Sequence, residues 1–207
     1  MTGKNDEPTS LPVPVDDGAA DHLCGGEIPR LRLPSTLGGE LDLANAALGL
    51  VIFYVYPRTG RPREPLPEGW DEIPGARGCT PQSCAFRDHV RELAAYGASV
   101  IGVSAQSPAE QLEFAQREHI PYPLLSDSGL KLAATLRLPT FEAAGMQLYR
   151  RLTFIVRARR SVKVFYPVFP PQQNASEVLT WLSESVLETN HARLSNSPIP
   201  PRPVKRK

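Results

Sequence analysis

The sequence is poor in cysteine, in net charge and in long apolar runs, and each of these shortages excludes a class of protein. Three cysteines in 207 residues are too few for a disulfide scaffold. The longest apolar run, LGLVIFYVY at 48–56, is far shorter than the roughly 20 residues that a membrane-spanning helix needs. A formal net charge of +1, with acids and bases interspersed, marks no surface for nucleic acid or a membrane. We therefore expect a globular protein with no nucleic-acid or membrane partner.

The chain also begins without the basic and apolar leader that is typical of secreted proteins. Together with the low cysteine content, this favours a reducing, cytoplasmic compartment in which the thiols are free. A hydrophobic content of 41% is enough for one domain with a core of its own.

The two ends of the chain differ in composition from its middle. Residues 1–27 are polar, rich in Pro and Gly, and without apolar periodicity, so they predict a disordered or loosely packed extension. Residues 191–207 are rich in proline and finish in basic residues, which predicts an extended tail that is either solvated or used for docking. We place a single domain at 28–190.

Strand and helix patterns alternate within this domain. The runs at 51–56 and 98–104 are continuously apolar, as in strands buried on both faces. Further elements are predicted as a helix at 79–96, a helix at 107–118 opened by a Ser107/Glu110 capping box, a strand at 123–126, a helix at 128–136, a hairpin of strands at 151–156 and 161–166, and a helix at 175–188. This order indicates an α/β protein with a thioredoxin-like fold, in which helices cover both faces of a mixed sheet that is mostly parallel at its centre.

Two of the three cysteines, Cys79 and Cys84, lie five positions apart at the predicted beginning of a helix. Free N–H groups and the helix dipole favour a thiolate at this end, and Arg77 lies just before it. Cys79 shares a helix face with Phe86 and Leu93, so its sulfur should lie at the rim of the core. Cys84 lies about 140° further round, so the two sulfurs can meet only if the first turns unwind. Either Cys79 is a reactive cysteine with a resolving partner, or both cysteines are buried and inert.

The stretch GCTPQSCAFRD at 78–88, which follows a strand ending in YP, resembles the Q-type (bacterioferritin-comigratory) peroxiredoxins. RRLTFIV at 150–156 resembles the strand in which that family carries an arginine three residues before a phenylalanine. The resemblance extends over roughly residues 25–188 and implies the same thioredoxin-like fold.

By this resemblance, Cys79 is the peroxidatic cysteine, Cys84 is the resolving cysteine, Arg151 stabilises the thiolate and the bound peroxide, and Pro57 shields the site. The implied activity is reduction of hydrogen peroxide or organic hydroperoxides, through a sulfenic acid and then a disulfide between the two cysteines. Thioredoxin or glutaredoxin would reduce that disulfide by exchange. The resemblance implies no metal or organic cofactor and a monomer or weak dimer.

The sequence departs from the family in the loop before the first motif cysteine. A proline-rich insertion, RTGRPREPLPEGWDEIPGAR at 58–77, follows Pro57, and Ala76 occupies the place of the family's threonine. In the family, the threonine hydroxyl hydrogen-bonds the thiolate and the peroxide. Thr59 is one candidate to supply it, and Thr80 or backbone N–H groups are the alternative. An insertion of this kind fits a lid or an edge for docking a partner.

Two other functions stay open. A thiol–disulfide oxidoreductase without peroxide chemistry would normally carry C-x-x-C, which is absent here. A thioredoxin-like redox sensor or binding module would result if the insertion had disabled the peroxidase site. The third cysteine, Cys24, forms only H-x-C with His22, so we expect no metal site and regard it as a spare thiol or an alternative resolving cysteine.

Overall fold

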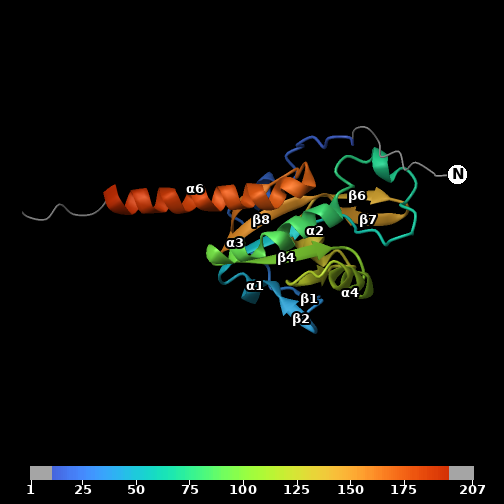
Figure 1. The fold of residues 1–207 in the computed structure, drawn as a ribbon, viewed down its shortest axis with the longest axis horizontal. Helices are drawn as coiled ribbons and strands as arrows, with labels where there is room; N and C mark the ends of the chain where they lie inside the picture. The colour runs from blue at the N-terminus through green and yellow to red at the C-terminus, as the bar shows by residue number, and fades with distance from the viewer. Residues whose placement is uncertain (1–10, 196–207) are drawn as a thin grey trace, which may run out of the picture.

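A five-stranded mixed sheet forms the centre of the computed structural model, which describes the backbone of residues 11–195 and the side chains of residues 11–187 (Figure 1). Two neighbouring pairs are parallel and two are antiparallel. The strands, in their order across the sheet, are β5 (Leu124–Ser126), β4 (Ala98–Ser104), β3 (Leu50–Val55), β8 (Leu152–Arg157) and β9 (Arg160–Phe165). The predicted mixed sheet and its terminal hairpin are confirmed.

Strand β3 is buried on both faces because its side chains alternate between two apolar clusters. Val51, Phe53 and Val55 belong to one cluster, whereas Ile52 and Tyr54 belong to the other. Helices α1 (Leu43–Ala46) and α5 (Lys131–Leu136) contribute to the first cluster, and α2 (Cys79–Asp88), α3 (Val90–Ala95), α4 (Pro108–Arg117) and α6 (Asn174–Ser195) contribute to the second. Helices therefore cover both faces, as predicted.

The predicted continuous helix at 79–96 is wrong in one respect, because it is divided into α2 and α3. His89, between them, has φ −97° and ψ 6°, which lies outside the helical region. The predicted buried face is nevertheless right, since Phe86 of α2 and Leu93 of α3 both lie fully buried in the same cluster.

Helix α4 begins as predicted. The Ser107 hydroxyl accepts a hydrogen bond from the Glu110 N–H at 3.3 Å, and the Glu110 carboxylate accepts one from the Ser107 N–H at 2.9 Å. Pro108 occupies the first helical position, where its missing N–H costs nothing.

Several short elements were not predicted. They are the helix α1, the antiparallel pairs β1 (Arg32–Pro34) with β2 (Glu40–Asp42) and β6 (Thr140–Ala143) with β7 (Met146–Tyr149), and the 3₁₀ helices η1 (Asp21–Leu23), η2 (Trp70–Glu72) and η3 (Pro171–Gln173). Figure 1 shows the insertion and the β6–β7 hairpin together at the end of the domain where α2 begins.

The ends of the domain differ from the expected boundaries. Ala20 and Leu23 are buried in the first cluster, so this part of the expected loose extension packs against the domain. Helix α6 continues to Ser195 and runs beyond the body of the domain (Figure 1), so the first residues of the expected tail are helical. Residues 1–10 and 196–207 lie outside the described part of the chain. Within the described part, no helix is long and apolar enough to span a membrane.

Candidate active site

Cys79 is the first residue of α2, and it is only 3% exposed. Gly78, just before it, has a φ of 98°, which favours glycine, and its backbone lies against the ring of Pro171. A Cβ at Gly78 would lie 2.5 Å from the Pro171 Cγ, so a side chain would not fit there. The Cys79 side chain joins the cluster of Phe86 and Leu93, which confirms that it faces the core.

The Arg151 guanidinium contacts the Cys79 sulfur directly. Arg151 Nη2 lies 3.1 Å from Cys79 Sγ, and the arginine is itself 3% exposed. The same nitrogen donates to the carbonyl oxygens of Ala76 at 3.2 Å and Arg77 at 3.0 Å, and Nε donates to that of Gly75 at 3.3 Å. These carbonyl oxygens fix the Arg151 guanidinium group beside the Cys79 sulfur. From that position its N–H groups can donate hydrogen bonds to a thiolate and to an oxygen atom bound beside it.

A buried polar chain fixes Arg151 from the other side, and the sequence analysis missed it. Arg151 Nη1 donates to Gln82 Oε1, and Gln82 Nε2 donates to Asn174 Oδ1 at 3.0 Å. The Thr153 hydroxyl also donates to Asn174 Oδ1, at 2.6 Å. Gln82 is three residues after Cys79 and so lies about 60° from it around the helix. A polar residue on that inward face was the available signal.

Thr59 lies at the site, held by a second residue that the sequence analysis missed. It is 3% exposed, and its hydroxyl and its N–H donate to Gln106 Oε1 at 3.0 and 2.8 Å. Gln106 Nε2 donates back to the Thr59 carbonyl at 3.2 Å, which fixes the orientation of the amide. The Thr59 hydroxyl proton is therefore used in the hydrogen bond to Gln106. The hydroxyl oxygen can still accept a hydrogen bond from a ligand. Thr59 and Thr80 line the same cavity as Cys79.

Pro57 lies buried at the end of β3 and is not among the residues that line this cavity. Its carbonyl accepts a hydrogen bond from the Ser104 hydroxyl at 3.0 Å. The Ser104 oxygen in turn accepts from the Gln106 N–H at 3.2 Å. Pro57 thus belongs to the support beneath Thr59 rather than to the cavity wall.

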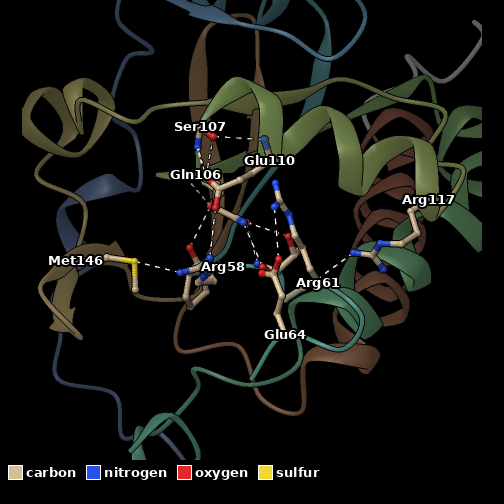
Figure 2. A network of polar contacts seen from close by, with 12 residues as sticks. Arg58, Arg61, Glu64, Gln106, Ser107, Glu110, Arg117 and Met146 are labelled. Atoms are coloured by element: carbon tan, nitrogen blue, oxygen red, sulfur yellow. Dashed lines mark hydrogen bonds and ion pairs between the residues drawn. The ribbon is translucent and has the colours of Figure 1, made fainter. Parts of the chain in front are cut away.

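Polar contacts tie the insertion to α4 and β7, as Figure 2 shows. Arg58 donates to Glu110 of α4 at 3.3 Å and to the sulfur of Met146 at 3.1 Å. Arg117, at the end of α4, donates to the carbonyl oxygen of Gly60 at 3.0 Å. The insertion is therefore anchored at its beginning beside the site.

An apolar contact anchors the other half of the insertion. Trp70 is 3% exposed and packs against Phe141 of β6, with ring centroids 6.2 Å apart. Ala76, Ala143 and Leu148 complete this small cluster. The insertion and the β6–β7 hairpin bury each other, which explains why both occur at the same end of the domain.

A cavity of about 510 Å³ opens between Cys79 and the insertion. Its wall includes Leu66 and Trp70 of the insertion and Pro171 of η3. A water molecule takes up about 30 Å³ in the liquid, and drug-sized ligands occupy pockets of about 300–1,000 Å³. The space is therefore far larger than hydrogen peroxide requires.

Cys84 lies apart from this cavity, as its position on the helix predicts. Its side chain is half-buried, and its sulfur lies 3.7 Å from Glu118 Oε2. Burial raises the pKa of Cys84, Arg87 opposes this shift, and the Glu118 carboxylate raises the pKa further. All three cysteines are free thiols, and Cys24 is exposed. Among residues 11–195, no cluster of His, Cys, Asp or Glu is arranged to hold a metal ion.

Two buried tyrosines hold the helix between the two cysteines. The Tyr54 hydroxyl donates to the Ser83 hydroxyl at 3.1 Å, and the Tyr122 hydroxyl donates to the Ser83 carbonyl at 2.8 Å. Burial raises the pKa of both phenols, so they remain protonated donors at neutral pH. Unwinding of α2 as far as Ser83 would break these bonds.

The known proteins that this chain resembles, in sequence and in structure, are peroxiredoxins. The AhpC/TSA family matches residues 73–165. A chloroplastic peroxiredoxin Q of Gentiana triflora is 31% identical over 184 residues, which cover 86% of this chain and 77% of the relative. Peroxiredoxin Bcp of Escherichia coli K12 is 26% identical over 166 residues, covering 78% and 97%. The crystal structure of peroxidoxin BcpB from Mycobacterium tuberculosis superposes with a TM-score of 0.63 at 27% identity, covering 78% of this chain and 96% of that one.

Proposed function

The chain belongs to the AhpC/TSA family of peroxiredoxins, which are thiol-dependent peroxidases, and from that premise we propose that Cys79 is the cysteine that attacks the peroxide. The observation that carries this proposal is the 3.1 Å contact between Arg151 Nη2 and Cys79 Sγ. This contact lies beside a cavity that is open to a substrate, whereas the Cys84 sulfur lies beside the Glu118 carboxylate and Cys24 is exposed.

The first step is a two-electron reduction of the peroxide. The Cys79 thiolate attacks one peroxide oxygen, so an S–O bond forms and the O–O bond breaks. The departing oxygen takes up a proton and leaves as water or an alcohol, and Cys79 becomes a sulfenic acid. Arg151 donates to the charge that develops on the departing oxygen. Thr59, whose proton is committed to Gln106, accepts a hydrogen bond from the peroxide O–H.

The second step forms a disulfide. Cys84 loses its proton and attacks the Cys79 sulfur, so an S–S bond forms, the S–O bond breaks and water leaves. Because Cys84 lies on the other side of α2, the start of that helix must unwind first. An external dithiol then reduces the disulfide by exchange. Thioredoxin or glutaredoxin as that dithiol, a cytoplasmic location, and a monomeric or weakly dimeric state stay predictions.

Stopped-flow mixing of the reduced protein with hydrogen peroxide, followed by mass spectrometry, tests both steps. We expect Cys79→Ser to abolish rapid peroxide consumption. Cys84→Ser should react once and stop at a sulfenic acid on Cys79, which dimedone traps. Cys24→Ser is the matched control and should behave as the wild type.

Two outcomes would contradict this assignment. One is dimedone labelling of Cys24 or Cys84 in place of Cys79. The other is a Cys79 that reacts no faster than a thiol in solution, which would favour the redox-sensor alternative. A dithiol exchanger, by contrast, would lose its first step when Cys84 is replaced.

A further inference from the structure

The cavity beside Cys79 has a distinctive wall. Apolar side chains such as Leu66 and Trp70 line it together with guanidinium groups, and none of the described residues that line it is acidic. The arginines are Arg58, Arg61, Arg77 and Arg117. Three of these arginines lie in the insertion at 58–77, so the segment that departs from the family pattern supplies most of the positive charge of this wall. An apolar cavity with guanidinium groups suits a ligand that has both a hydrocarbon part and an anionic group.

Three of the four arginines are already committed to partners that fix them in place. Two of them, Arg58 and Arg117, hold the insertion on α4, as Figure 2 shows. The partners are Glu110 and Met146 for Arg58, Asp71 for Arg77, and Glu113, Glu118 and the Gly60 carbonyl for Arg117. Turning any of these guanidinium groups toward a ligand would release a structural contact.

Arg61 is the exception. Among the side chains that the structure describes, its ion-pair partner is Glu64, at a long 3.5 Å, and the two side chains are 45% and 55% exposed. An exposed pair of this kind contributes little to stability and is weakened by salt. A carboxylate that enters the cavity can therefore replace Glu64 as the partner of Arg61 without disturbing the anchors of the insertion.

We propose that the cavity binds organic hydroperoxides that carry a carboxylate, and that Arg61 recognises the carboxylate while the hydroperoxide group reaches Cys79. This inference rests on the proposed peroxidase function and adds a substrate class to it. The hydrocarbon part of the substrate packs against Leu66 and Trp70. Hydrogen peroxide has neither group, so it leaves most of the cavity unused.

The test compares a fatty-acid hydroperoxide with its methyl ester, both below the concentration at which micelles form. The two substrates share the hydroperoxide and the chain and differ only in the charge that Arg61 would bind. We expect the wild type to favour the acid in kcat/KM by about tenfold, the gain typical of one charge-assisted hydrogen bond. The preference should decrease as the salt concentration rises.

Variants of the ion pair locate the effect. Arg61→Gln should bring the acid-to-ester ratio to about one, whereas Arg61→Lys keeps the charge and should retain part of the preference. Glu64→Gln is the matched control on the other side of the pair. It removes the competing carboxylate and should raise the ratio.

Equal rates for acid and ester in the wild type would overturn the inference, as would a preference that survives in Arg61→Gln. Hydrogen peroxide turnover by the wild type separates this failure from a failure of the proposed function. Rapid turnover of hydrogen peroxide with an acid-to-ester ratio of one would reject only the carboxylate site. Failure with all three substrates would reject the peroxidase assignment as well.

Discussion

Replacing Gly78 with alanine should destabilise the beginning of α2 by two separate effects. A φ of 98° costs an L-residue about 1–2 kcal/mol, on the scale known for left-handed backbone conformations. The new Cβ would also lie 2.5 Å from the Pro171 Cγ, and overpacking of this kind costs about 1–3 kcal/mol. We therefore expect the free energy of unfolding to decrease by about 2–5 kcal/mol in Gly78→Ala.

Gly38 offers a matched control for the backbone effect. Its φ is 99°, and a Cβ built there would have no atom within 4 Å. Gly38→Ala should therefore cost only the backbone part, about 1–2 kcal/mol. The effect of alanine on the unfolded chain is common to both variants and cancels in the comparison.

Urea unfolding of the reduced wild type and the two variants measures the difference. We expect Gly78→Ala to be less stable than Gly38→Ala by about 1–3 kcal/mol, and each kcal/mol lowers Tm by about 2–4 °C in a chain of this size. Equal losses in the two variants would refute the reasoning, because they would mean that Pro171 can move away at no cost. A displaced Cys79 should also slow the single-turnover reaction with peroxide in Gly78→Ala alone.

Two further predictions concern the surroundings of the two cysteines. Gln82→Leu removes a hydrogen-bond partner of both Arg151 and Asn174. We therefore expect the free energy of unfolding, measured in urea, to decrease by about 1–3 kcal/mol and the single-turnover reaction with peroxide to be slower. An unchanged rate would show that the backbone carbonyls alone position Arg151. Because burial and Glu118 raise the pKa of Cys84, its alkylation by iodoacetamide, measured by mass spectrometry, should be slow at pH 8 and speed up at higher pH. Glu118→Gln lowers that pKa and should shift the pH profile to lower pH, whereas an unshifted profile would contradict the assigned electrostatic effect.

The sheet was predictable because its strands carry strong local signals. The apolar runs at 51–56 and 98–104 coincide with β3 and β4 to within one residue, since strands buried on both faces need an unbroken apolar sequence. The capping box at Ser107 fixed the beginning of α4 for a similar local reason. The short hairpin of β6 and β7 was missed because its four-residue strands gain their stability from the insertion, which is distant in sequence.

The site was predictable only where a side chain is placed by its own helix or by family resemblance. Helical geometry places Cys79 against the core, and the resemblance singled out Arg151, which lies beside the Cys79 sulfur. Gln106 and Asn174 could not be inferred, because each meets its partner through the tertiary fold and looks like an ordinary surface amide in the sequence. The sequence left Thr59 and Thr80 as alternatives for the motif threonine, and both side chains line the cavity beside Cys79.

Ser83 lies between the two cysteines, and its hydrogen bonds to Tyr54 and Tyr122 have a consequence for timing. If α2 unwinds as far as Ser83, those bonds would break before Cys84 could reach a sulfenic acid on Cys79, and the lifetime of the sulfenic acid would depend on how fast they break. During that time, a second peroxide can oxidise the sulfenic acid to a sulfinic acid, which thiols do not reverse. The local stability of one helical turn would therefore determine the peroxide concentration at which oxidation to the sulfinic acid inactivates the protein.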